Sequence, residues 1–206
     1  ALVLGTGPAS TYYVRRALNA ATLSDPVLNT QSGRLDELDA NVVSEVDVLI
    51  LCDLERLDRT QTQIVHDFVS NGGGLIVFPS VRADVKYLNR DFLPGIMPVR
   101  IRDITGRAED QTQFRTLDNA AEKHPLFADL IGQEVTDAAH FFAHFSLETE
   151  RPIESLVYFD DGQIALASAW RGSGRSALSS FPLDLAWSDL PLRGLFPPMI
   201  LSLIHI

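Results

Sequence analysis

The sequence is poor in cysteine and in basic residues, and each shortage excludes a class of protein. Its one cysteine, Cys52, cannot form an internal disulfide framework or a multi-cysteine metal site. Lysine and arginine total 17 against 27 acidic residues, which gives a formal net charge of −10 at pH 7. No basic run of five or more residues offsets this charge. Because nucleic acids and anionic membrane surfaces repel a negative body, we expect neither as a partner.

Long apolar runs are also missing. No stretch reaches the roughly 18 apolar residues that suggest a membrane span, so a membrane anchor would have to lie outside this sequence. The first residues already have the pattern of a strand, with no signal peptide and no initiator methionine. Residues 199–206 stop within a helical pattern that has no cap. We therefore expect a domain cut from a longer protein.

The first half of the sequence alternates between strands and helices. Residues 1–4, 46–52 and 75–78 are short apolar runs, typical of strands buried on both faces of a parallel sheet. A further short strand is predicted around residues 26–28. Strands that alternate with helices in this way predict a parallel α/β sheet with right-handed crossovers.

Two helices of this half have recognisable ends. The first follows Ser10 or Thr11, either of which can cap it. The second opens with the capping box of residues 58–61 and ends at the glycines of residues 71–74, which tolerate the left-handed conformation at a helix C-terminus. Its predicted buried stripe consists of Ile64, Val65, Phe68 and Val69.

The second half is richer in predicted antiparallel strands. Residues 155–159 and 163–170 flank an Asp-Gly turn and predict a hairpin, and residues 175–181 return after a second turn. Other strands are expected over residues 99–104, 113–117 and 139–147, with a helical turn at residues 124–127. A final helix should begin near residue 188 or 189, with Pro191 in its first turn. With no repeat or long linker, we expect one domain over residues 1–206.

Four segments carry a resemblance to a known family. Residues 47–78 pass from a strand through a loop and a helix to a Gly-rich turn and the next strand. Residues 12–18 (YYVRRAL), 172–175 (GSGR) and 181–193 (FPLDLAWSDLPLR) narrow the match. Together they resemble the class I glutamine amidotransferase-like domain of bacterial aerotolerance (BatA-like) membrane proteins. The run WSDLPLR is the most specific part, and the resemblance covers nearly the whole chain.

The resemblance implies a fold and a location. The fold would be α/β, with a flavodoxin-like or amidotransferase-like, mostly parallel sheet flanked by helices and an antiparallel extension in the C-terminal half. In the family the domain follows membrane segments and a von Willebrand A-like region. This implies a domain that is membrane-anchored in the full-length protein and lies on the periplasmic or extracytoplasmic side.

The catalytic machinery of active amidotransferases is missing. The family's nucleophilic cysteine would stand in the turn after residues 75–78, where this sequence reads Pro79-Ser80-Val81-Arg82. The family's His-x-Glu pair is absent as well, since no histidine has a glutamate two residues later. Loss of a nucleophile costs many orders of magnitude in rate, so we expect no enzyme activity and no cofactor.

Three features could still carry chemistry, and each has a structural interpretation that we favour. Cys52 ends a predicted strand, where α/β folds place ligands, but it stands one strand too early for the family's nucleophile and suits a core position. Ser80 lacks the flanking glycines of a nucleophile elbow and suits a loop or a helix cap. Residues 5–7 (GTG) lack the third glycine of a dinucleotide fingerprint and suit a tight strand-to-helix turn.

The remaining candidates are two histidines and part of the family-like run of residues 181–193, which we call the corner. His140 and His144 have the i,i+4 spacing of a metal pair but lack the glutamate of a zinc protease; on a strand they would share one face. We expect Trp187 to plug the base of the sheet, Asp189 to favour the positive end of the last helix, and Arg193 to pair with it at helical spacing. A structural corner is favoured, and the residues to consider for partner or ligand binding are Asp184, Trp187, Asp189 and Arg193.

Three functions are open at this point. The first is a non-catalytic interaction or ligand-binding domain of a membrane-anchored envelope protein, whose partner is another protein or other domains of the same chain. Loops at the C-terminal edge of the sheet would make the contact. The second is a diverged hydrolase or amidotransferase that uses Cys52 or Ser80. The third, on fold analogy alone, is a carbohydrate or small-molecule binding module.

Overall fold

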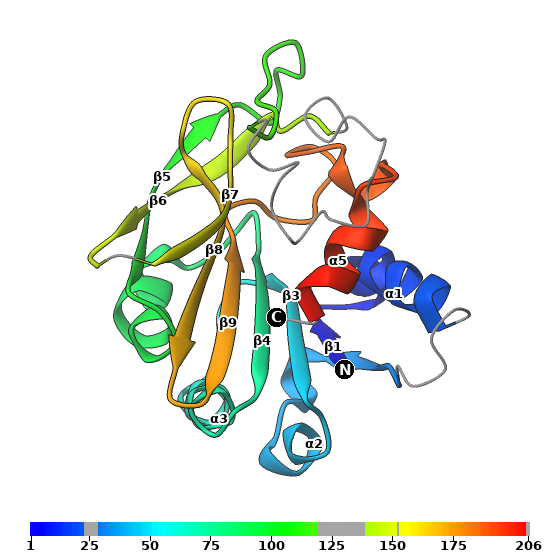
Figure 1. Ribbon diagram of the computed structural model, residues 1–206, viewed down its shortest axis with the longest axis vertical. Coiled ribbons are helices and arrows are strands. Elements are labelled where there is room, and N and C mark those ends of the chain that lie inside the picture. The colour runs from blue at the N-terminus through cyan, green and yellow to red at the C-terminus, as the bar shows by residue number, and fades with distance from the viewer. Residues whose placement is uncertain (23–28, 119–138, 152, 205–206) are drawn as a thin grey trace.

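A computed structural model describes residues 1–22, 29–118, 139–151 and 153–204. Within these residues seven strands form one sheet, in the order β2-β1-β3-β4-β9-β8-β7 (Figure 1). The first five of that order are mutually parallel, and β8 runs antiparallel to both β9 and β7. The strands are β1 (Leu2–Gly5), β2 (Gln31–Arg34), β3 (Val48–Leu54), β4 (Gly74–Pro79), β7 (Glu154–Tyr158), β8 (Ile164–Arg171) and β9 (Gly174–Ser179).

The central strands are buried on both faces, as their continuous apolar runs predict. Along β3, Ile50 and Cys52 face one buried layer, whereas Leu49 and Leu51 face the other, because successive side chains of a strand alternate. The first layer is closed by helices α1 (Pro8–Thr22) and α5 (Phe196–Ile204), which pack against each other. The second is closed in part by α3 (Arg59–Ser70). The outcome is an α/β sandwich with a mostly parallel sheet.

A second, two-stranded antiparallel sheet stands beside the main one. Its strands are β5 (Val99–Gly106) and β6 (Ala143–Thr149), and we call it the β5–β6 ribbon. Val99, Ile101, Phe145 and Leu147 turn inward and join the same buried layer as α3. Three short helical segments connect β4 to this ribbon: α4 (Val85–Tyr87), η2 (Leu88–Phe92) and η3 (Leu93–Gly95). Two others lie between β2 and β3: η1 (Leu35–Glu37) and the five-residue helix α2 (Ala40–Ser44).

The predicted ends of α3 are confirmed. The Asp58 carboxylate accepts a hydrogen bond from the Gln61 backbone N–H at 2.8 Å, and Gln61 Oε1 accepts one from the Asp58 N–H at 3.1 Å. These two bonds satisfy donors that would otherwise be orphaned at the helix start. At the other end Gly72 has φ of +113°, outside the range that L side chains favour. Of the predicted stripe, Val65 and Val69 are fully buried and Ile64 and Phe68 are partly buried.

Other element predictions are wrong in instructive ways. Residues 113–117 form isolated bridges from Arg115 to Phe141 and from Leu117 to Phe159, not a strand. The helix after β1 starts at Pro8, so Ser10 and Thr11 lie inside it rather than before it. The Ser10 hydroxyl reaches back to Gly7: it accepts from the Gly7 N–H at 3.2 Å and donates to the Gly7 carbonyl at 2.8 Å. The predicted strand at 26–28 and turn at 124–127 lie outside the described residues.

The expected C-terminal helix is split in two. A 3-10 turn, η7 (Leu190–Leu192), comes first, and α5 begins only at Phe196. Its next two residues are prolines, which are favoured in a first helical turn because their missing N–H would have no helical partner there. Asp189 does not cap η7 with its side chain. Within the described residues, no helix is long and apolar enough to cross a membrane.

Candidate functional site

Cys52 is buried in the layer between the sheet and helices α1 and α5, with no measurable solvent exposure. Burial, together with the neighbouring charge of Asp53, raises the pKa of this thiol far above its usual range. Because the thiolate is the nucleophilic form, a thiol in this position is unreactive at neutral pH.

Ser80 is a turn residue rather than an exposed nucleophile. It follows β4, is almost fully buried, and its hydroxyl oxygen accepts a hydrogen bond from the Arg82 N–H at 3.1 Å. Its own backbone N–H donates to the Leu54 carbonyl at 2.9 Å, which ties the end of β4 to the end of β3. The hydroxyl is therefore engaged in holding the turn.

The C-terminal edge of the parallel strands carries a hollow of about 500 Å³, which we call the strand-end hollow. Thr6 lines it, and its hydroxyl donates to the Asp53 carboxylate at 2.5 Å. Asp53 has φ of +58°, a left-handed conformation that non-glycine residues rarely adopt. A Cβ at Gly5 would overlap the Ser10 hydroxyl oxygen and lie 2.7 Å from a Thr11 methyl carbon, so a side chain fits there only if those groups move. The residues 5–7 turn is thus a tight strand-to-helix connection.

Charges around the strand-end hollow are already paired within the chain. Arg56 lies 3.1 Å from Asp84, Arg34 lies 2.9 Å from Asp36, and Arg82 lies 3.5 Å from Glu55. All three pairs are substantially exposed, so each contributes little to stability. This edge is where α/β folds place ligands, but its arginines are balanced before any ligand arrives.

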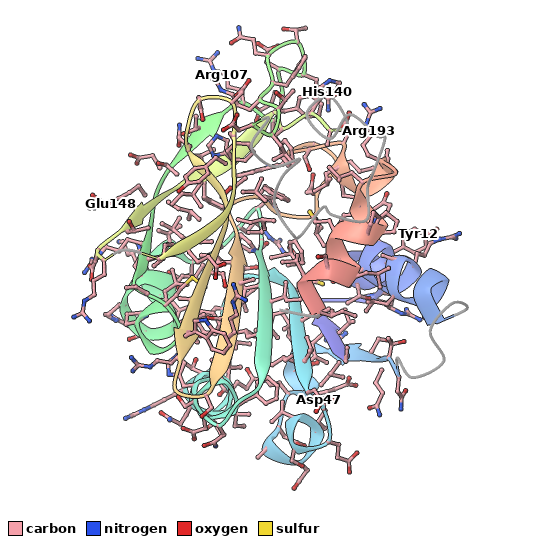
Figure 2. The ribbon with its side chains drawn as sticks, viewed as in Figure 1. Tyr12, Asp47, Arg107, His140, Glu148 and Arg193 are labelled. Atoms are coloured by element: carbon pink, nitrogen blue, oxygen red, sulfur yellow. The ribbon has the colours of Figure 1, made fainter. Side chains whose placement is uncertain are left out.

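A second candidate site is the corner formed by the C-terminal segment, where the structure brings His140 to Asp189 and Arg193. The Asp189 carboxylate accepts hydrogen bonds from the His140 backbone N–H at 2.7 Å and from the His140 ring Nδ1 at 3.0 Å. Arg193 donates to the same carboxylate. The side chains of His140 and Arg193 meet at one end of the molecule (Figure 2). We call His140, Asp189 and Arg193 the corner triad.

Asp189 is held ionised by its neighbours. Burial by itself would raise the pKa of Asp189, but the hydrogen bonds from Arg193 and from His140 outweigh burial and hold the pKa below its usual value. The i,i+4 spacing of Asp189 and Arg193 predicted this ion pair, although the intervening residues form a 3-10 turn rather than an α-helix. The 49-residue separation from His140 gave no sequence signal.

The other two corner residues have structural roles. Asp184 closes a turn, because its carboxylate accepts from the Ala186 N–H at 2.8 Å. The Trp187 ring lies 5.0 Å from the Phe145 ring, and the Trp187 carbonyl accepts from the Phe142 N–H at 2.8 Å. Trp187 therefore fastens the corner to the β5–β6 ribbon. Trp187 also belongs to the buried layer that lies between α3 and one face of the main sheet.

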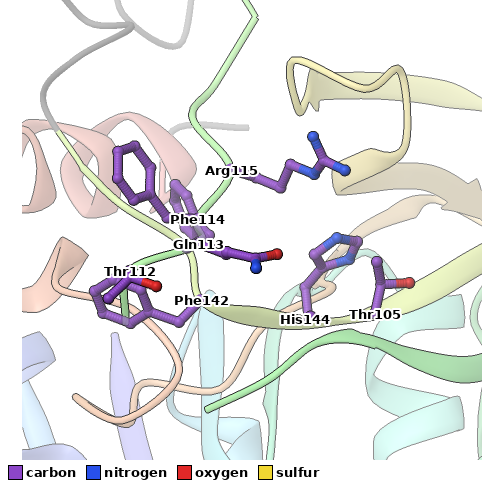
Figure 3. Close-up of a pocket in the computed structure, with 9 residues that line it drawn as sticks. Thr105, Thr112, Gln113, Phe114, Arg115, Phe142 and His144 are labelled. Carbon is purple, nitrogen blue, oxygen red and sulfur yellow. The ribbon is translucent and has the colours of Figure 1, made fainter. Parts of the chain in front are cut away.

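A third candidate, which we call the ribbon hollow, lies next to the corner triad and has a volume of about 520 Å³ (Figure 3). Most of its wall was not predicted from the sequence. The wall consists of Thr105, Gly106, Thr112, Gln113, Phe114, Arg115, Phe141, Phe142 and His144. The Phe114 ring lies 4.1 Å from the His140 ring, so the hollow and the triad are continuous.

His144 lies beneath the ribbon hollow and differs sharply from His140. It is 1% exposed, and its Nδ1 lies 3.1 Å from the Phe145 carbonyl oxygen. Burial lowers the pKa of His144, which keeps the ring neutral at neutral pH. Its Nε2 has no hydrogen-bond partner among the described residues. Nor do three or more histidine, cysteine or acidic side chains of this part of the chain gather as a metal site would require.

Comparisons with known proteins relate this chain to others by fold. No family model matches the sequence, and no curated protein sequence is significantly similar to it. Cytoplasmic Protein STM3548 from Salmonella typhimurium has a similar structure (TM-score 0.76, 11% identity, 99% of this chain and 97% of that chain). Cytoplasmic Protein STM1381 from Salmonella typhimurium LT2 is comparable (TM-score 0.75, 13% identity, 99% and 97%).

The same fold occurs as one part of larger chains. A β-galactosidase from Rahnella sp. R3 matches with a TM-score of 0.69 and 14% identity, over 99% of this chain but only 30% of that one. At such identities the likeness shows the fold alone. It assigns neither an activity nor a location to this chain.

Proposed function

We propose that this chain is a non-catalytic interaction domain with a flavodoxin-like, amidotransferase-like fold, carried by a membrane-anchored protein of the bacterial envelope on its extracytoplasmic side. The envelope part of the proposal rests on the sequence resemblance, above all on the WSDLPLR run at residues 187–193. The non-catalytic part rests on one observation, the complete burial of Cys52. A diverged hydrolase would need a nucleophile at the surface, and neither Cys52 nor Ser80 reaches it.

The corner is the surface that we propose for the partner. Exposed apolar side chains accompany the triad: Phe114, whose ring contacts the His140 ring, is 46% exposed, and Leu192, next to Arg193 in the sequence, is 64% exposed. Leu185, in the same C-terminal segment, is 40% exposed. Exposed apolar groups beside a hydrogen-bonded charged pair are typical of a protein contact, in which the apolar groups lose water and the arginine fixes orientation. The partner is then another protein or another domain of the same chain.

The first experiment tests the absence of catalysis. The purified domain is assayed for glutamine hydrolysis and for ester hydrolysis beside Cys52→Ala and Ser80→Ala variants. We expect no turnover above background in any of the three. We also expect native Cys52 to resist iodoacetamide and to react fully once urea has unfolded the chain. Turnover that disappears in either alanine variant would contradict the proposal.

The second experiment tests the contact surface. A photo-crosslinking amino acid is placed at Leu192 in the full-length protein, in its native membrane, and at Trp170 as a matched control. Trp170 is 66% exposed but belongs to β8, away from the corner. We expect one discrete crosslinked product from position 192 that is missing from position 170. Equal labelling at both positions, or none at 192, refutes the corner as the contact surface.

A further inference from the structure

Helix α1 presents a basic surface on an acidic molecule. Its exposed side includes Tyr12, Arg15 and Arg16, which we call the α1 basic face. No acidic residue precedes Asp25 in the sequence, and α5, which packs against α1, contains no charged residue. These two helices therefore contribute two positive charges and no negative charge to a chain whose net charge is −10.

The helix brings the three side chains of this face together. Residues three and four apart on a helix are neighbours, so Arg15 and Arg16 both stand one turn after Tyr12. The Arg16 Nη1 donates to the Tyr12 hydroxyl at 3.2 Å, and its guanidinium carbon lies 5.7 Å from the centre of the ring. The Tyr12 ring also makes a T-shaped contact with the Tyr13 ring at 5.2 Å. Because Tyr13 is partly buried against the core, these contacts hold the exposed ring and Arg16 in place.

The two guanidinium groups lack a carboxylate partner. Most arginines of the chain form ion pairs with aspartate or glutamate. Among the described residues, by contrast, the Arg15 side chain has no hydrogen bond or ion pair, and the Arg16 side chain contacts Tyr12 alone in this way. Each guanidinium keeps donors in the planar fork that matches a carboxylate. The face can therefore accept carboxylates from another molecule.

The small number of charges decides between classes of acidic partner. Anionic membranes are bound by clusters of about four to eight basic residues and nucleic acids by basic stripes, whereas this face carries two arginines on a chain that such polyanions repel. An acidic protein segment needs only one or two carboxylates within reach. Tyr12 is 48% exposed and adds an apolar ring, and tyrosine and arginine are residue types enriched at protein contacts. The chemistry of the face fits a protein.

We propose that the α1 basic face binds an acidic segment of a partner protein. Carboxylates of that segment pair with Arg15 and Arg16, and an apolar side chain lies against the Tyr12 ring. Tyr12 already orients Arg16, so less side-chain freedom is lost on binding. Figure 2 shows Tyr12 on the outer side of α1, apart from His140 at one end of the molecule. The face is separate from the corner and does not depend on the contact proposed there.

NMR of arginine side chains tests this binding at the groups concerned. Protein labelled with ¹⁵N-arginine is titrated with a helical peptide of glutamate, alanine and leucine, and the Nε–H signals of Arg15 and Arg16 are followed. We expect both signals to move and to saturate. The same peptide with glutamine in place of glutamate should leave them unmoved. By fluorescence anisotropy of the labelled glutamate peptide, Arg15→Gln/Arg16→Gln and Tyr12→Ala should each weaken binding at least fivefold.

A charge-matched control separates this face from the overall charge of the chain. Arg59→Gln/Arg171→Gln removes two exposed arginines from α3 and β8, so it has the same net charge as Arg15→Gln/Arg16→Gln, and it should bind the peptide as the parent does. The proposal is overturned if both double variants lose affinity equally, if the glutamine peptide binds as tightly as the glutamate peptide, or if neither arginine signal moves. Tighter binding to vesicles of phosphatidylglycerol and phosphatidylcholine than to the peptide would also overturn it, because the partner would then be a membrane.

Discussion

Replacing Asp189 by alanine removes the acceptor on which the corner triad depends. Its carboxylate holds the His140 backbone N–H, the His140 ring and the Arg193 guanidinium. Without it, the backbone N–H at 2.7 Å loses its partner in a part-buried setting. Asp189→Asn is the matched variant, because it keeps an oxygen for that N–H but removes the charge.

The expected loss follows from these bonds. Hydrogen bonds to an ionised group contribute about 1.5–3 kcal/mol, and an orphaned buried donor costs about 1–3 kcal/mol. Because the carboxylate is partly exposed and its bonds are not additive, we expect Asp189→Ala to lower the free energy of unfolding by about 2–3 kcal/mol and Asp189→Asn by about 1 kcal/mol. For a chain of this length 1 kcal/mol lowers Tm by about 2–4 °C, so the alanine variant should melt about 6 °C lower.

The pH dependence gives a second, independent readout. The pKa of Asp189 is lower in the folded than in the unfolded chain, so its charge stabilises the fold above the unfolded value of 3.8. That stability disappears as pH falls through the lower, folded pKa. The gap in unfolding free energy between the parent and Asp189→Asn, measured by urea titration, should therefore be constant near neutrality and shrink below pH 3.8. An alanine variant within 0.5 kcal/mol of the parent, roughly the scatter of neutral surface substitutions, would refute the reasoning.

Three further predictions concern the ribbon, the hollow and the main sheet. Gly106→Ala should destabilise the fold by at least about 1 kcal/mol more than Gly162→Ala in urea unfolding. Both glycines have positive φ (+84° and +81°), but only at position 106 would the new methyl meet the Phe142 carbonyl. Equal losses of stability in the two variants would count against this clash. The pKa of His144 is lower in the folded chain than its unfolded value of 6.5, so the unfolded chain binds more protons below pH 6.5. The free energy of unfolding of the parent should therefore fall as pH drops below 6.5, and His144→Phe should reduce this dependence of stability on pH between pH 5 and 8. Asp58→Ala removes the α3 cap and should cost about 1 kcal/mol in the same assay, whereas no change would mean that water replaces the cap.

Local patterns predicted the first half of the fold well. The run at residues 46–52 is strand β3 with its start shifted by two residues, and the capping box at Asp58 starts α3 as expected. Both signals act within a few residues, so the sequence displays them directly. Where contacts between distant segments decide the structure, the sequence was misleading. Asp189, two residues before Pro191, has the position of a helix cap, but its carboxylate accepts from His140 instead of capping the turn that follows.

The candidate sites divide in the same way. The Asp189–Arg193 pair was predictable from spacing, and the core position of Cys52 from its apolar run. The ribbon hollow was not, because it depends on the bridge that pairs Arg115 with Phe141 and on the bend at Gly106. The sequence predicted a strand over residues 113–117, where the structure has isolated bridges instead. The buried state of His144 likewise follows from the stacking of its ring on Phe159, 4.3 Å away, and not from its spacing to His140.

The position of β9 has a consequence for how the chain is made. Residue 75 of β4 pairs with residue 176 of β9, so the sheet is completed by a strand that is synthesised about a hundred residues later. Until then β4 is an open edge whose residues Leu75, Ile76, Val77 and Phe78 are all apolar. Contacts that distant in sequence form slowly, and an unpaired apolar edge attracts other chains. We therefore expect nascent or truncated chains that lack β9 to aggregate through β4.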